Sequence, residues 1–212
     1  MRKLASIQKI LDIQPIPGAD AIEVATINSW KVVVKKDEFT IGELIVYCEV
    51  DSFIPHAIAP FLSKGQYPKV YDGVEGERLR TVRLRGQLSQ GLVLPYSNWF
   101  SKLDGTLPYA LEGEDVSEYL NIVKYEPPVS AQLAGISKGA FPSCFPKTDE
   151  ERIQNLTGQW PDLQEQEYEV TEKLEGSSMS VGLLEGDAIP RDGEFIVCSR
   201  NLNLKETEGN TL

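Results

Sequence analysis

The first hundred residues alternate apolar and polar positions in short runs separated by Gly and Pro. In the run Trp30–Val34 the residues Trp30, Val32 and Val34 alternate with Lys31 and Val33, which is the period of a strand with one buried face. The preceding run, Ile22–Ile27, is rich in β-branched residues, and only Asn28-Ser29 separates the two. A connection this short predicts a β-hairpin.

Further strands are expected along the same stretch. Leu44–Val50 and Leu92–Pro95 are short, mostly apolar runs, and a further strand is expected at Arg78–Arg85, before a loop from Gly86 to Gly91. About five strands with little helical periodicity predict a small closed β-barrel such as an OB-fold, rather than a helical domain. A compact β-sandwich is the alternative.

The chain changes character near Pro127-Pro128, where paired prolines discourage both helix and strand. We therefore expect two domains, an OB-fold-like domain at residues 1–124 and a second domain at residues 125–212. The expected class is α+β, mainly β.

A short helix and three strands are expected in the second domain. Thr148 and Glu151 have the spacing of a capping box, so a helix should begin there and end near Gly158 and Trp160-Pro161. The strands are expected at residues 168–173, 179–184 and 195–200.

Composition narrows the possible chemistry. His56 is the only histidine, which excludes mechanisms that need two. The three cysteines are far apart and form no Cys-x-x-Cys pair, so neither a disulfide framework nor a structural zinc site is indicated. No apolar run has the length of a membrane span and the first residues lack a signal-peptide core, so we expect a cytoplasmic protein without membrane association.

Charge limits where a nucleic acid could bind. The net charge is −11, which opposes phosphate binding by the surface as a whole. A nucleic-acid surface must therefore be a local patch, and one basic stretch stands out. The candidate RNA-binding residues are Arg78, Arg80, Arg83 and Arg85. An ordinary solvated strand is the alternative interpretation.

Lys173 has a setting that suits covalent nucleotidyl transfer. It lies at the end of an expected strand, which would fix the approach of its amine, and Gly176 allows a tight turn beside a nucleotide. The amine needs cationic neighbours or partial burial to lose its proton near neutral pH. Taken alone, Lys-x-x-Gly also fits a surface lysine before a turn.

Three segments, in order, resemble RNA ligases. Residues 168–179, with Glu172 before Lys173 and small polar residues after Gly176, resemble the first nucleotidyltransferase motif. Residues 146–155 resemble the segment that precedes the nucleophile in ATP-dependent RNA ligases with an N-terminal OB domain, and residues 198–201 resemble the next motif.

The resemblance implies a site. Lys173 would become adenylated by ATP, Arg152 would approach the outer phosphates, and Arg200 would contact the ribose or the RNA end phosphate. Glu175, where many members have aspartate, would order water around Mg2+ or Mn2+. The further nucleotide-binding residues would be Glu172 and Lys147. The later motifs of the family are absent before Leu212, so we expect only the beginning of the nucleotidyltransferase domain.

The implied function is sealing of RNA 3′-hydroxyl and 5′-phosphate ends, in a nicked duplex or a tRNA, with no protein partner indicated. Three alternatives remain. Residues 7–55 also resemble tRNA-binding OB domains, so the chain could be a non-catalytic RNA-binding module. A DNA ligase and an mRNA capping guanylyltransferase are related enzyme alternatives.

Overall fold

The structure is a computed structural model and describes residues 3–100, 108–126, 133–142, 145, 152–172, 176–184 and 194–206. The chain forms two compact units. The first combines Met1–Tyr125 with Glu150–Gln166, and the second combines Glu126–Asp149 with Glu167–Leu212. Each unit therefore contains two stretches that are separated in the sequence.

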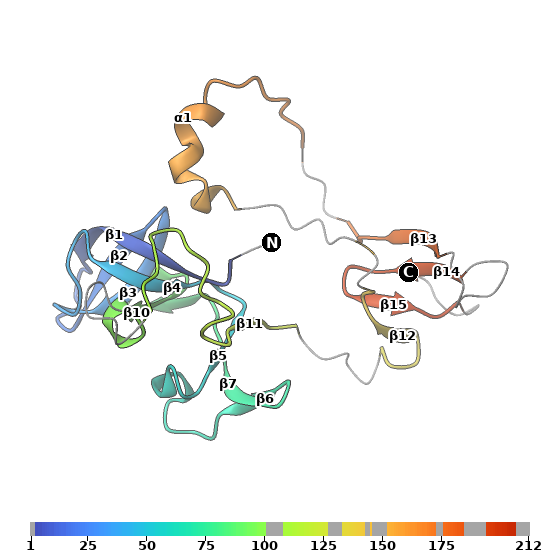
Figure 1. The fold of residues 1–212 in the computed structure, drawn as a ribbon, viewed down its shortest axis with the longest axis horizontal. Helices are drawn as coiled ribbons and strands as arrows, with labels where there is room; N and C mark the ends of the chain where they lie inside the picture. The colour runs from blue at the N-terminus through green and yellow to red at the C-terminus, as the bar shows by residue number, and fades with distance from the viewer. Residues whose placement is uncertain are drawn as a thin grey trace. The chain divides into compact units, whose positions relative to one another are not determined.

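The first unit contains a five-stranded antiparallel sheet of order β10-β4-β1-β2-β3 (Figure 1). Its strands are β1 (Ala5–Pro15), β2 (Ile22–Ile27), β3 (Trp30–Lys35), β4 (Leu44–Cys48) and β10 (Leu92–Pro95). The long strand β1 pairs with β4 along its first half and with β2 along its second half. A register shift between Ile10 and Asp12 lets β1 bend between the two partners.

Hydrogen bonds join the two ends of this sheet. The Gln90 amide donates to the Lys31 carbonyl at 2.8 Å, and the Val33 amide donates to Ser89 Oγ at 2.9 Å. The sheet therefore curls until β3 meets the segment before β10, which protects edge groups that would otherwise be unpaired. The expected fold class, mainly β with an N-terminal OB-like barrel, is confirmed.

The hairpin expected at residues 22–34 is confirmed. β2 and β3 are antiparallel, with Ile27 opposite Trp30 across a two-residue connection. Asn28 has φ +52, a left-handed conformation that asparagine tolerates better than most residues.

The single strand expected from Arg78 to Arg85 is wrong. β7 (Val74–Arg78) ends there, and β8 (Val82–Leu84) then pairs with β9 (Gln87–Ser89), where a loop was expected. Arg85 and Gly86, at φ +49 and +83, form the two-residue turn of this hairpin. Leu79 packs into the core directly after β7, and residues 79–81 separate β7 from β8.

Strand β4 is buried on both faces. Ile45 and Tyr47 pack into the barrel core with Trp30 and Val93, while Val46 and Cys48 pack into a second core. The second core includes Ile7, Ile54, Leu94, Tyr96 and Phe100. Because alternate side chains of a strand point to opposite faces, β4 holds the barrel against the segments that cover it.

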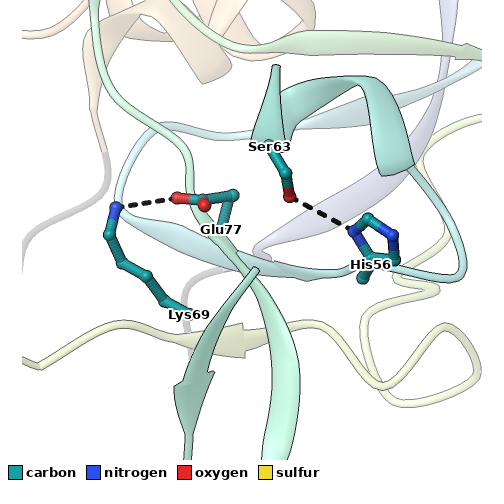
Figure 2. Close-up of polar contacts among 4 residues, drawn as sticks. All are labelled: His56, Ser63, Lys69 and Glu77. Carbon is teal, nitrogen blue, oxygen red and sulfur yellow. Dashed lines mark hydrogen bonds and ion pairs between the residues drawn. The ribbon is translucent and has the colours of Figure 1, made fainter. Parts of the chain in front are cut away.

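A second sheet of order β11-β5-β7-β6 lies in the same unit. Its other strands are β5 (Ser52–Pro55), β6 (Lys69–Tyr71) and β11 (Val123–Lys124), and the short 3-10 helices η1 (Pro60–Ser63) and η2 (Tyr96–Asn98) complete this part. Figure 2 shows two polar contacts that fasten it. His56 Nδ1 lies 3.2 Å from Ser63 Oγ, and Lys69 Nζ lies 2.8 Å from Glu77 Oε2.

The described part of the returning segment is helical in short pieces: η3 (Ile153–Asn155), η4 (Thr157–Gln159) and α1 (Trp160–Leu163). The expected helix end near Gly158 and Trp160-Pro161 is wrong, because α1 begins at that point. Proline is tolerated in a first helical turn, where its missing N–H would have no intrahelical partner. The expected capping box at Thr148 and Glu151 lies outside the described residues.

The second unit contains a sheet of order β12-β15-β14-β13. Its strands are β12 (Ser137–Ala140), β13 (Ser180–Leu184), β14 (Glu194–Cys198) and β15 (Leu202–Leu204). The strands expected near 179–184 and 195–200 are confirmed. The strand expected at 168–173 is wrong for its described residues, 168–172, which are irregular. Val170 is 93% exposed there, so no apolar burial favours a strand.

No helix in the described parts of the chain is long and apolar enough to cross a membrane.

Candidate functional site

The described residues include only part of the site expected from the sequence. Lys173, Glu175 and Lys147 lie outside them. Glu172 is described and exposed, at the end of the irregular segment 168–172. Arg152 and Arg200 are both described, but they belong to different compact units.

Arg152 lies against the barrel of the first unit. Its guanidinium carbon is 5.5 Å from the centre of the Trp30 ring, within the range of a cation–π contact. Trp30 is the first residue of β3 and is only 3% exposed, because most of its ring packs in the barrel core. A rigid aromatic surface thus supports the Arg152 side chain.

Asn155, one turn of chain after Arg152, joins two buried residues of the barrel. Trp30 Nε1 donates to Asn155 Oδ1 at 2.6 Å, and Asn155 Nδ2 donates to Glu49 Oε1 at 2.6 Å. Glu49 is 4% exposed, so a carboxylate oxygen there needs a donor. The side-chain amide satisfies a donor and an acceptor that have little access to water.

Hydrogen bonds between Ser29 and Gln154 also attach this segment to the barrel. Both the amide and the hydroxyl of Ser29 donate to the Gln154 carbonyl, at 3.3 and 3.1 Å. An open groove of about 650 Å³ lies beside this contact. Its lining residues are Ser29, Ile153, Gln154, Thr157 and Trp160.

None of Trp30, Glu49 and Asn155 is a site residue that the sequence predicts. In the sequence Trp30 belongs to a hairpin and Asn155 to the end of a family-like segment. The partners of Asn155 are 125 and 106 residues away in the chain, so no local pattern connects them.

Arg200 lies in the turn that joins β14 to β15. Cys198 pairs with Asn203, and the Ser199 amide donates to the Leu202 carbonyl at 2.9 Å, which leaves Arg200 and Asn201 at the tip. Arg200 is exposed, whereas Cys198 beside it is fully buried. The buried cysteine fixes the strand end, and the arginine projects from it.

The four arginines of the expected RNA patch have different surroundings. Arg78 is paired within the fold, with Asp51 and with the ring of Tyr125. Arg80, Arg83 and Arg85 are exposed. Arg83 Nη1 donates to the Gly86 carbonyl at 2.8 Å and so also supports the β8–β9 turn.

Within the described ranges no three His, Cys, Asp or Glu side chains gather in a way that could hold a metal ion. Cys48 and Cys198 are both buried. Burial raises the pKa of the Cys48 thiol from 9.0 to about 12, because the thiolate would lose its hydration. Cys48 is therefore a neutral core residue near neutral pH.

The comparisons with known proteins match the barrel in one case and nearly the whole chain in another. A family model described as an OB-fold domain matches residues 4–96. A comparison with curated proteins found no match.

Solved structures resemble almost the entire chain. Naegleria gruberi RNA ligase with PPi is 46% identical over 99% of this chain, with a TM-score of 0.71. Mutants of that ligase with AMP and Mn and with ATP and Mn are 45% and 46% identical over the same share, with TM-scores of 0.72 and 0.70. This chain covers 59% of each of these three chains. The chain belongs to the RNA ligase family with an N-terminal OB-fold domain.

Proposed function

We propose that this chain is part of an ATP-dependent RNA ligase, with Lys173 as the residue that is adenylated. The observation that carries the proposal is the 46% identity to Naegleria gruberi RNA ligase over 99% of the chain. The ATP and AMP present in structures of that ligase support an adenylate donor of the same kind here.

The proposed reaction has three steps. Lys173 Nζ attacks the α-phosphorus of ATP, a phosphorus–nitrogen bond forms, pyrophosphate leaves and the amine loses its proton. A 5′-phosphate oxygen of an RNA end then attacks the AMP phosphorus, a phosphoanhydride bond forms, and the phosphorus–nitrogen bond breaks, which releases the Lys173 amine. The RNA 3′-hydroxyl attacks that phosphate, AMP leaves, and a phosphodiester bond seals the strand.

We assign Glu172 and three basic side chains to nucleotide binding. Arg152 would neutralise charge on the outer phosphates of ATP, and Arg200 would contact the ribose or the RNA end phosphate. Glu172 and Lys147 would contact the nucleotide beside Lys173. Positioning and charge neutralisation supply most of the catalysis in reactions at phosphorus.

A divalent cation, Mg2+ or Mn2+, would neutralise the triphosphate when bound. Glu175 would hold it through water, because carboxylate, water and phosphate oxygens are the donors these ions prefer. The Mn present with the related ligase supports this choice.

We propose the division into an RNA-binding OB-like domain at 1–124 and the beginning of a nucleotidyltransferase domain at 125–212. RNA ends would be the substrate, with the exposed arginines Arg80, Arg83 and Arg85 contacting phosphates and Arg78 supporting them from within the fold. We place the protein in the cytoplasm.

The test is covalent labelling of the full-length protein. The protein is incubated with Mg2+ and ATP labelled on the α-phosphate, denatured, and examined for retained label. We expect label on the wild type and none on Lys173→Ala. The matched control is Lys138→Ala, an exposed lysine on β12 of the same unit, which should keep its label.

Other outcomes would identify the alternatives. Label from GTP alone would indicate a capping enzyme, and sealing of DNA but not RNA 3′ ends would indicate a DNA ligase. RNA binding without any label would indicate a binding module, an alternative that the close similarity to a ligase does not favour.

A further inference from the structure

The position of Arg152 depends on contacts between its segment and the barrel. The described part of that segment consists of 3-10 turns and one four-residue helix, too short to be rigid in isolation. Its polar attachments to the barrel include the Arg152–Trp30 ring contact, the Ser29–Gln154 hydrogen bonds and the Asn155 side chain.

Asn155 suits its two partners in a way that few side chains could. An indole N–H can only donate, and an ionised carboxylate can only accept. The Asn155 amide offers one acceptor and one donor, and its two 2.6 Å contacts therefore fix which way the amide faces. Aspartate would place a carboxylate against Glu49, and leucine would remove both of these hydrogen bonds.

Trp30 links Asn155 to Arg152. Its Nε1 binds Asn155 while its ring faces the Arg152 guanidinium at 5.5 Å, so one buried side chain contacts both residues. Trp30 is fixed by the barrel core, and Glu49 directly follows strand β4. The relative positions of β3 and β4 therefore set where Arg152 lies.

We propose that Asn155 is a positioning residue for Arg152, and that through Trp30 and Glu49 it makes the barrel set the place of this cation in the adenylation step. The inference rests on the proposed function, in which Arg152 serves the outer phosphates of ATP. Those phosphates leave as pyrophosphate in the first step. Asn155 should then matter for lysine adenylation and not for the final sealing step.

The test compares two steps in the full-length protein. The first measurement is the rate of covalent AMP attachment as a function of ATP concentration. The second is sealing, without ATP, of a nicked RNA duplex whose 5′ end already carries AMP. Asn155→Leu should slow AMP attachment about tenfold or more and change sealing less than about twofold, because small displacements of a positioned group cost large factors in rate.

Two further variants separate positioning from folding. Trp30→Phe keeps an aromatic ring under Arg152 but removes the indole donor, so it should reproduce part of the Asn155→Leu defect. The double variant Arg152→Ala with Asn155→Leu should be no slower than Arg152→Ala alone, because Asn155 acts through Arg152. Gln159→Ala, an exposed position in the same segment, is the control and should match the wild type.

The outcomes are distinct. Equal decreases in both steps would mean that Asn155 only stabilises the fold, and multiplying decreases in the double variant would mean that it acts independently of Arg152; either result overturns the inference. A wild type that attaches AMP leaves the proposed function standing in both cases. A wild type that never attaches AMP overturns both proposals.

Discussion

Arg78 and Asp51 form an ion pair in the first unit, with Arg78 Nη2 2.5 Å and Nε 3.2 Å from the same carboxylate oxygen, Asp51 Oδ1. The Arg78 guanidinium also lies 5.0 Å from the centre of the Tyr125 ring. Tyr125 in turn packs near Tyr71 and Phe53. Arg78 thus joins the end of β7 to the turn after β4 and to an aromatic cluster, so its first role is in the fold.

Replacing Arg78 should lower stability more than replacing its exposed neighbour. The Arg78 and Asp51 side chains are 31% and 38% exposed, so water weakens their attraction, and we expect Arg78→Gln to cost about 1 kcal/mol of unfolding free energy. Arg80→Gln should change it by less than about 0.5 kcal/mol. Urea unfolding followed by circular dichroism measures both, and equal midpoints would contradict a structural role for Arg78.

The exposed arginines should contribute to RNA affinity through charge. Replacing Arg80, Arg83 and Arg85 with glutamine should reduce the slope of log affinity against log salt concentration by roughly 0.7–0.9 for each phosphate that the variant no longer binds. Fluorescence anisotropy with labelled RNA between low and moderate salt measures the slope. The control replaces Lys35 and Lys36, two exposed lysines at the end of β3. An unchanged slope in the arginine variant would place RNA on another surface.

Gly91 should not tolerate a side chain. Its φ is +124, and a Cβ there would collide with the Tyr47 ring and lie 2.8 Å from the Cys48 carbonyl oxygen. We expect Gly91→Ala to cost on the order of 3 kcal/mol, from backbone strain and from displacement of the β4 core. Gly42→Ala, at φ +83 in open space, should cost only about 1 kcal/mol. Thermal unfolding would show whether the two variants differ.

Cys48 should make the protein lose stability at alkaline pH. Its folded pKa of about 12 exceeds the unfolded value of 9.0, so its contribution is complete below pH 9 and is lost as pH rises toward 12. Between pH 8 and pH 10 the ionised thiolate stabilises the unfolded chain by about 1.4 kcal/mol. Cys48→Ala lacks this term, so its unfolding free energy should fall less over that interval. Parallel pH profiles for the two proteins would rule out a buried, neutral thiol at this position.

Local patterns in the sequence were sufficient for part of the fold. The hairpin of β2 and β3 was predicted correctly, because alternation with period two and a short polar connection act over a few residues. The same reasoning failed between Arg78 and Arg85. There Leu79 packs into a core built from distant segments, and such contacts are not encoded in the local alternation of residues.

For the candidate site, too, the sequence predicted some features and not others. The RNA ligase prediction rested on a resemblance to family motifs of three segments, which contain Arg152, Lys173 and Arg200 in the expected order, and motif order is a property of the chain alone. The similarity to a solved ligase confirms that family. The individual roles of these residues stay predictions.

The sequence by itself determined the β-rich class of the fold, the first hairpin and the family. Only the tertiary structure decided that Arg78 is engaged by Asp51, that Trp30 contacts both Arg152 and Asn155, and that Asn155 binds Glu49. The physical reason is the range of the interactions. Hydrophobic periodicity and turns depend on neighbouring residues, whereas these side chains acquire their partners only when the fold brings together segments 27 to 125 residues apart.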